Sequence, residues 1–117
     1  MLSNKEFGKE LEKRTRQFAV RIIRLSMKLP DTPEGRVVRN QMTKSGTSIG
    51  ANYREANRAR SKADFKNRIK ICESEGSETQ YCLEVIVDVK WLSWTEAKSD
   101  YEESGELLGI FTSAASK

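Results

Sequence analysis

The amino-acid sequence predicts an all-α protein, an antiparallel up-down-up-down four-helix bundle formed by a single domain over residues 1–117. Three observations predict this class. Apolar residues recur every three or four positions in four long segments, the only two prolines stand close together at 30 and 33, and no segment shows the alternation typical of a strand. A chain of this length buries enough apolar surface to fold without disulfides or a metal. The expected helices cover about residues 5–29, 34–57, 62–91 and 96–112, joined by short loops.

The first helix is indicated by a spacing of three and four residues that continues for about five turns. Its apolar side is formed by Leu11, Thr15, Phe18, Ile22, Leu25 and Leu29. Pro30 ends this helix, because the residue before a proline is pushed out of the helical region. Asp31 or Thr32 is then placed to cap the second helix.

The second helix repeats the same spacing, but with many small residues on and beside its apolar side. The spaced positions are Val38, Met42, Ser45, Ile49, Asn52 and Ala56, and the small residues include Gly46 and Gly50. Small side chains let a neighbouring backbone approach closely, which offsets part of the helix-propensity cost of about 1 kcal/mol for each glycine. We therefore expect a tight helix contact along this segment.

The third and fourth helices follow from two further repeats. The third contains Phe65, Ile69, Cys72, Gly76, Thr79, Leu83, Ile86 and Lys90, and the fourth contains Ala97, Tyr101, Ser104, Leu108 and Phe111. Ser61 is the expected N-cap of the third helix and Thr95 that of the fourth. Cys72 and Cys82 then lie too far apart on one helix to form a disulfide, and we expect Cys72 in the core and Cys82 partly buried.

The composition argues against an enzyme. The chain has no histidine, which removes the usual general base and the commonest zinc ligand, so no catalytic residue, cofactor or metal site is expected. The first 14 residues lack an apolar core of signal-peptide length, and no stretch approaches the 18 apolar residues of a membrane span. We expect a cytoplasmic protein that does not enter a membrane.

The charges are distributed unevenly along the chain. Residues 1–70 hold 18 Lys and Arg against 7 Asp and Glu, whereas residues 71–117 hold 3 against 10, so that +11 and −7 give the net charge of +4. The first helix carries a basic row, spaced by three and four residues, that contains Arg14, Gln17, Arg21, Arg24 and Lys28. Such a row is usually a solvated face, but it can also follow the phosphates of RNA or DNA. A third explanation is assembly, in which the basic half of one subunit meets the acidic half of the next.

A dense polar cluster ends the second helix, and it includes Asn52, Arg54, Arg58 and Arg60. It either fixes the turn between the second and third helices or binds a ligand. If these helices form an antiparallel hairpin, residue i faces roughly residue 118 − i, which places Arg54 near Asp64 and sets Glu75 and Glu78 close to the seam between the two helices. We interpret Asn52, Asp64, Glu75 and Glu78 as a hydrogen-bonded structural network that fixes helix register.

One central segment resembles a known family. The run KSGTSIGANYREANRARSKADF over residues 44–65 is followed after nine residues by Glu75-x-x-Glu78-Thr79-x-Tyr81-x-Leu83. This pattern resembles the four-helix-bundle proteins encoded in intervening sequences of bacterial 23S ribosomal RNA genes. The sequence departs from that pattern at Cys82, where a tryptophan is usual, and at Ser74 and Ser77, where charged residues are usual.

The resemblance implies a ring-shaped homopentamer without established enzyme activity. It also implies a distant relation to accessory proteins of diversity-generating retroelements, which are basic pentamers that bind nucleic acid and a reverse transcriptase. Two functions are therefore expected. The first is weakly sequence-specific nucleic-acid binding through Arg14, Arg21, Arg24, Lys28, Arg54, Arg58 and Arg60. The second is a protein-interaction or assembly module whose charges serve contacts with another subunit or a protein partner, without nucleic acid.

Overall fold

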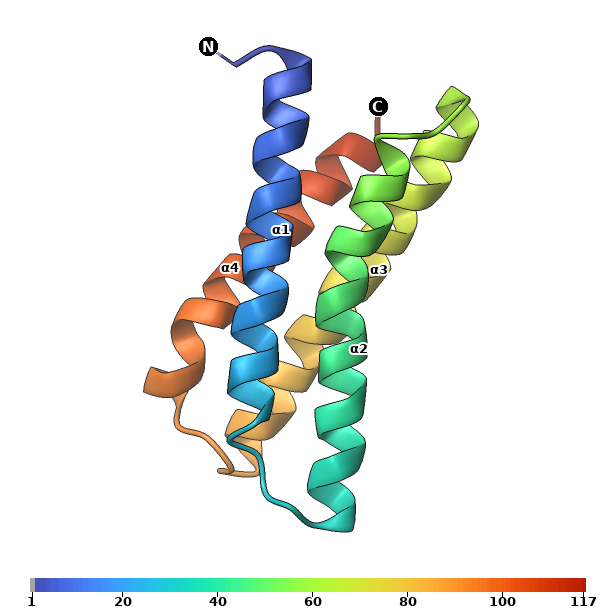
Figure 1. Ribbon diagram of the computed structural model, residues 1–117. Helices are drawn as coiled ribbons and strands as arrows, with labels where there is room; N and C mark the ends of the chain where they lie inside the picture. The colour runs from blue at the N-terminus through green and yellow to red at the C-terminus, as the bar shows by residue number, and fades with distance from the viewer. Residues whose placement is uncertain (1) are drawn as a thin grey trace.

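The computed structural model describes residues 2–117 and contains four helices and no strand in that range, which confirms the all-α class. The helices are α1 (Asn4–Ser26), α2 (Pro33–Ala56), α3 (Lys62–Asp88) and α4 (Trp94–Ala115). Successive helices run in opposite directions along the long axis of the molecule (Figure 1). None of the helices in the described residues is long and apolar enough to cross a membrane.

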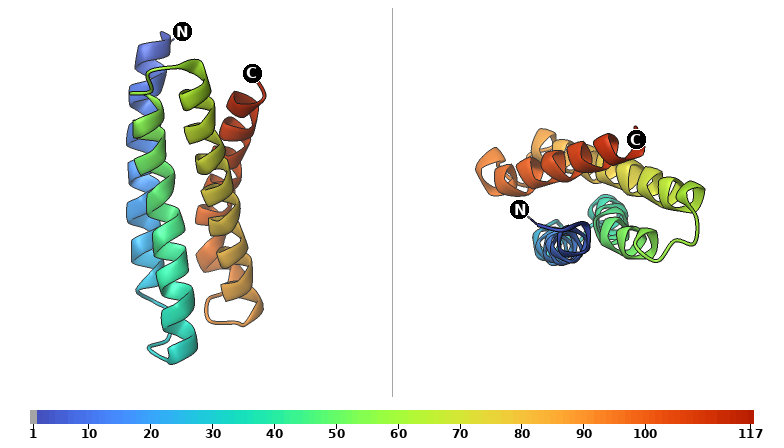
Figure 2. Two further views of the ribbon diagram at one scale, coloured as in Figure 1. Left: turned by 90° about the vertical axis from the view of Figure 1, so that its right-hand side faces the viewer. Right: turned by 90° about the horizontal axis from the view of Figure 1, so that it is seen from above.

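The helices form two layers. Seen from above, α1 and α2 lie in one layer and α3 and α4 in the other (Figure 2). Each helix packs against two others, since α2 contacts α1 and α3, while α4 contacts α3 and, over a smaller region, α1. The pairs α1 and α3, and α2 and α4, are diagonal, and their backbones do not approach each other closely. Side chains of one diagonal pair still meet in the core, where the rings of Tyr53 and Phe111 have centroids 5.7 Å apart. The outward sides of α1 and α3 consequently face away from each other.

Hydroxyl side chains start all four helices. Ser3, Thr32, Ser61 and Ser93 are the N-caps, and each side chain accepts a hydrogen bond from the backbone amide three residues later. The assignments of Thr32 and Ser61 are confirmed. The assignment of Thr95 is wrong, because Ser93 and Glu96 form a reciprocal capping box that starts α4 at Trp94.

Two helices are shorter than expected from the sequence. The first ends at Ser26 and not at Leu29, and α3 ends at Asp88 and not at residue 91. Lys90 adopts a left-handed conformation with φ of 65°, after which the amide of Trp91 donates to the carbonyl of Ile86 at 3.0 Å. This is a common way to close a helix C-terminus, and the apolar spacing of the sequence does not encode it.

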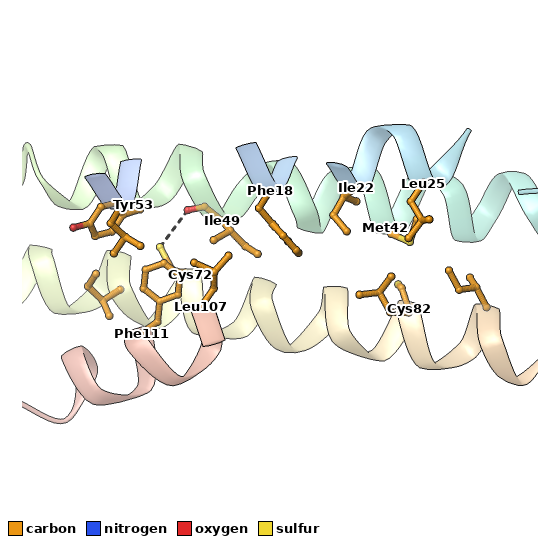
Figure 3. Close-up of a cluster of buried hydrophobic side chains, with 14 of the residues drawn as sticks. Phe18, Ile22, Leu25, Met42, Ile49, Tyr53, Cys72, Cys82, Leu107 and Phe111 are labelled. Carbon is orange, nitrogen blue, oxygen red and sulfur yellow. Dashed lines mark hydrogen bonds between the residues drawn. The ribbon is translucent and has the colours of Figure 1, made fainter. Parts of the chain in front are cut away.

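The core consists of the predicted apolar sides. The largest fully buried side chains include Phe18, Ile22, Met42, Ile49 and Phe111, which meet between the two layers (Figure 3). Several positions differ from the expectations, among them Tyr53, which is 5% exposed and takes the core place expected for Asn52. Cys82 is buried, at 3% exposure, and Leu107 fills the core position expected for its half-buried neighbour Leu108.

The tight contact expected along the second helix is found between α2 and α1. A Cβ added to Gly46 would lie 2.7 Å from Cγ2 of Ile22, and one added to Gly50 would lie 3.0 Å from Oγ1 of Thr15. At Gly46 a Cβ would not fit unless Ile22 shifted, and at Gly50 it would be tighter than an ordinary contact, so the two glycines allow the close spacing of this layer.

Candidate nucleic-acid interface

The basic row of α1 faces the acidic side of α4 in the same chain. Arg14 donates from Nε to Oε2 of Glu103 at 2.7 Å and from Nη2 to Oε1 of Glu103 at 2.6 Å. Its Nη2 also donates to Glu106 at 3.0 Å. The planar guanidinium thus binds one carboxylate with two parallel bonds, which is the strongest geometry for such a pair. These hydrogen bonds raise the pKa of Arg14 further above its usual value.

Two more members of the row are also paired with α4. Arg21 donates from Nε to Oδ1 of Asp100 at 2.6 Å and from Nη2 to the hydroxyl of Ser99 at 2.8 Å. Nζ of Lys28 lies 4.0 Å from Oε2 of Glu96. Hydrogen bonds from Ser93 lower the pKa of Glu96, with a smaller contribution from Lys28, which keeps this carboxylate charged. Within one subunit, therefore, the charge segregation of the sequence stabilises the seam between α1 and α4.

Arg24 differs from the rest of the row. It is exposed and has no ion pair among the described residues. It lies on the outward side of α1 beside Val20 and Ile23, which are 42% and 39% exposed. Of the predicted nucleic-acid residues in this row, Arg14 and Arg21 thus bind α4, Lys28 in the turn after α1 lies at a longer distance from it, and Arg24 faces solvent.

The end of the α2–α3 hairpin carries a group of cations, with the exposed acids Glu55 and Asp64 beside them. We call it the hairpin end, and it consists of Arg54, Arg58, Arg60, Lys62 and Lys66. All except Lys66 are exposed, and Lys66 is partly exposed. Arg54 lies 3.7 Å from Oε1 of Glu12, whereas the other four have no ion pair within residues 2–117.

Local packing explains why these cations stand free. Ala56 is buried, and the chain leaves α2 at Asn57 and enters α3 at the N-cap Ser61. Arg58 and Arg60 lie on this connection, Lys62 is the first residue of α3, and all three are exposed. The fold therefore leaves a cluster of positive charge at one end of the bundle.

The four residues predicted to form a structural network are not brought together. Asn52 accepts a hydrogen bond from Nη1 of Arg68 at 3.2 Å, so it does join α2 to α3. Arg54 points to α1 and not to Asp64, which is exposed in the first turn of α3. The other two predicted members, Glu75 and Glu78, also lie apart from this contact.

Glu75 is the least satisfied carboxylate of the described residues. Its Oε2 atom is buried and has no hydrogen-bond partner, while the neighbouring Glu78 is exposed. Burial raises the pKa of Glu75, the charge of Glu78 raises it further, and Lys44 acts in the opposite direction. Glu75 is thus not part of the expected hydrogen-bonded network. It is a partly buried acid whose charged form is disfavoured by its surroundings.

The remaining hydrogen bonds between α2 and α3 are made by small, buried side chains. Thr79 donates to the hydroxyl of Ser45 at 2.8 Å, and Sγ of Cys72 donates to the carbonyl of Ile49 at 3.4 Å (Figure 3). Burial raises the pKa of Cys72 to about 12, so that this thiol is held protonated in the core. Both cysteines are free, and residues 2–117 hold no group of three or more histidine, cysteine or acidic side chains placed to bind a metal ion.

Sequence reasoning missed two parts of this surface. The first is the acidic side of α4 that pairs with α1, and the second is the contribution of Lys62 and Lys66 to the hairpin end. A signal for the acidic side was present, since Glu96, Asp100 and Glu103 are spaced by four and three residues. That spacing matches the spacing of the basic row on α1.

Comparisons with known proteins agree on the family. The family model of the 23S rRNA-intervening sequence protein matches residues 9–113. A crystal structure of a protein of unknown function from the S23 ribosomal protein family of Bacteroides thetaiotaomicron is similar to this chain, with 35% sequence identity and a TM-score of 0.84. The match covers 91% of this chain and 98% of that one. The comparison with curated proteins gives no match.

Proposed function

Because the chain belongs to the family of 23S rRNA-intervening sequence proteins, we propose that it is a non-catalytic bundle that binds RNA or another nucleic acid through the hairpin end. We further propose that it acts as a homo-oligomer, a ring of five subunits as the family resemblance implies. The binding role rests on one observation, the cluster of exposed cations around the α2–α3 connection of which four have no ion pair in the described residues.

The chemistry of the hairpin end suits a phosphate backbone. Lysine and arginine side chains that contact phosphates release condensed counterions, which gives affinity without sequence readout. Side chains already paired with carboxylates contribute less, because binding must first break those pairs. The proposal therefore assigns Arg58 and Arg60 the main role and gives Arg14, Arg21 and Lys28 a structural role at the α1–α4 seam.

A mobility-shift titration tests the binding role. The labelled probe is a structured RNA, and a duplex DNA of equal length serves as comparison, at about 50 mM and about 200 mM salt. The wild-type chain should bind at the lower salt concentration and weaken steeply at the higher one. The variant Arg58→Gln with Arg60→Gln should lose most of this affinity.

A control variant removes the same charge from elsewhere. Lys90 and Lys98 are exposed cations outside the hairpin end, just after α3 and near the start of α4, and neither has an ion pair in the described residues, so Lys90→Gln with Lys98→Gln should bind like the wild type. Absence of binding to either probe at low salt contradicts the proposal, and so does equal weakening by both double variants.

A second function, a protein-interaction module without nucleic acid, is favoured by a different observation. Several large apolar side chains are exposed on the outward sides of α1 and α3, among them Met27 at 73% and Tyr81 at 66%. If this module were the whole function, the chain would assemble or bind a protein while the titration above showed no shift with RNA or DNA.

A further inference from the structure

The outward side of α1 carries a second regular repeat in addition to the core repeat. Arg16, Val20, Ile23 and Met27 are spaced by four, three and four residues, which places them on one side of the helix. All four are exposed, including the three apolar ones at 42%, 39% and 73%. We call these four residues the α1 stripe.

The outward side of α3 carries a matching repeat. Ile71, Ser74, Glu78, Tyr81 and Val85 are spaced by three, four, three and four residues. Ile71 is 40% and Tyr81 66% exposed, Ser74 and Glu78 are exposed, and Val85 is partly exposed. We call these five residues the α3 stripe. Two apolar repeats on one helix, one in the core and one outside it, are the pattern of a helix that packs on both sides.

The two stripes lie on different sides of the bundle. The helices α1 and α3 are diagonal, their backbones are not neighbours and they belong to different layers (Figure 2). Their core repeats point inward, so the two outer stripes lie on different sides of the bundle. Two different surfaces on one subunit are what a head-to-tail assembly requires.

The stripes also lie at the same height along the bundle. The contacts of α2 with both helices show which positions of α1 and α3 lie at the same height. Gly50 of α2 meets Thr15 of α1, and the adjacent Ile49 accepts a hydrogen bond from Cys72 of α3. Position 15 of α1 is therefore level with about position 72 of α3. Both helices run in the same direction away from this level (Figure 1).

A second pair of contacts made by α2 gives the same relative height of α1 and α3. Further along α2, Gly46 meets Ile22 of α1, and the adjacent Ser45 bonds to Thr79 of α3. The α1 stripe over residues 16–27 is thus level with the α3 stripe over residues 71–85. A second copy rotated about an axis parallel to the bundle, without a shift along it, brings one stripe against the other.

From this placement we infer that the α1 stripe of one subunit packs against the α3 stripe of a second copy of this chain. The inference rests on the proposed assembly and specifies its two surfaces. The helices meet in parallel, with Ile23 and Met27 at the height of Tyr81 and Val85. The contact has no rise along the bundle axis, so successive copies stay at one level, and they close into the proposed ring of five when each copy is rotated by one fifth of a turn from the last.

The charges beside the two stripes are complementary. Lys13, Arg16 and Arg24 are exposed on the outward side of α1 and have no ion pair in the described part of the chain. Glu78 stands exposed in the middle of the α3 stripe. The interface therefore joins an apolar stripe with basic neighbours to an apolar stripe that contains an acid, which favours this pairing over the pairing of either stripe with itself.

The contact also has a consequence for the proposed function. In a ring without rise, the hairpin ends of all subunits lie on the same side of the assembly. Several weak phosphate-binding surfaces on one particle then act together on one nucleic-acid molecule and raise the overall affinity.

Two variants test the contact, each measured by sedimentation in the absence of nucleic acid. The first replaces Val20, Ile23 and Met27 by glutamine, and the second replaces Ile71 and Tyr81 by glutamine. Glutamine is a neutral helix former, and all five positions are exposed, so circular dichroism should show folded chains. Each variant alone should fall from the mass of the assembly to that of a single 13.3 kDa chain.

Mixing the two variants gives the decisive result. The first variant keeps an intact α3 stripe and the second keeps an intact α1 stripe, so the mixture should form a one-to-one dimer and nothing larger. A mixture that stays monomeric overturns the inference, as does assembly of either variant alone or a monomeric wild-type chain. The variant Phe7→Gln, which removes an exposed apolar side chain of α1 outside the stripe, should assemble like the wild type.

The hairpin variant separates this inference from the binding role. Arg58→Gln with Arg60→Gln should assemble fully and fail to bind nucleic acid. If the wild type assembles but binds no nucleic acid, the inferred contact stands and the binding role fails. If the stripe variants assemble and still bind nucleic acid, the inferred contact fails and the binding role stands.

Discussion

Arg21 and Asp100 join the first helix to the last through a bond of 2.6 Å from Nε to Oδ1. Asp100 is 9% exposed, so its carboxylate needs a partner when α4 folds against α1. The backbones of these two helices approach each other over a smaller region than those of the other neighbouring pairs. Polar pairs consequently carry much of the α1–α4 seam.

Removing the acid from this pair should destabilise the fold. Asp100→Ala leaves Arg21 without its carboxylate, and we expect a loss of about 1 to 2 kcal/mol in the free energy of unfolding, limited by the solvent exposure of the arginine. Urea denaturation measures the loss. The control Glu102→Ala removes an exposed acid from the same helix, and a loss no larger than that of this control contradicts the structural role of the pair.

An alanine should have opposite effects on stability at Gly46, which lies in the close approach of α1 and α2, and at Gly109, which lies outside it. Gly46→Ala places a Cβ at 2.7 Å from Ile22, so we expect a loss of about 1 to 3 kcal/mol from overpacking. Gly109→Ala meets no atom within 4 Å and should gain about 0.5 to 1 kcal/mol from helix propensity. Thermal unfolding of both variants gives the comparison, and a neutral Gly46→Ala refutes the tight contact.

Glu75 should make stability depend on pH. Its pKa in the folded chain is raised above 4.5, chiefly by burial, so folding favours the protonated form. The stabilisation from this group is present below the unfolded pKa and is lost as the pH rises through the folded pKa.

The substitution Glu75→Gln mimics the protonated acid and should raise the melting temperature by about 2 °C near pH 7, with no gain near pH 3.5. Melting curves at the two pH values measure the difference. Glu102→Gln on the exposed side of α4 should show no such dependence, and an equal gain at both pH values would disprove the assignment to Glu75.

The sequence predicts those parts of the fold that depend on near neighbours. The core sides of all four helices follow from residue spacing, and Thr32 and Ser61 are recognisable as caps because a cap acts within three residues. The end of α3 could not be predicted, because position 90 fits the spacing of three and four residues that indicates the helix. The left-handed conformation of Lys90 closes the helix there all the same.

The candidate site depends on distant neighbours and was only partly predictable. Counting residues back from the turn placed Arg54 beside Asp64, but α2 presents Arg54 to Glu12 of α1. The observed contact of Ser45 with Thr79 also lies several residues from the register that a symmetric hairpin gives. Which face of a helix meets which neighbour is set by the packing of the whole bundle, and a single segment does not contain that information.

The most direct test of the binding role is the slope of log affinity against log salt concentration for one RNA. The wild type and the Arg58→Gln, Arg60→Gln variant should differ in slope by about 2, since two phosphate-contacting cations are removed. The Lys90→Gln, Lys98→Gln control should keep the wild-type slope. An unchanged slope in the hairpin variant would contradict the claim that the hairpin end binds the phosphate backbone.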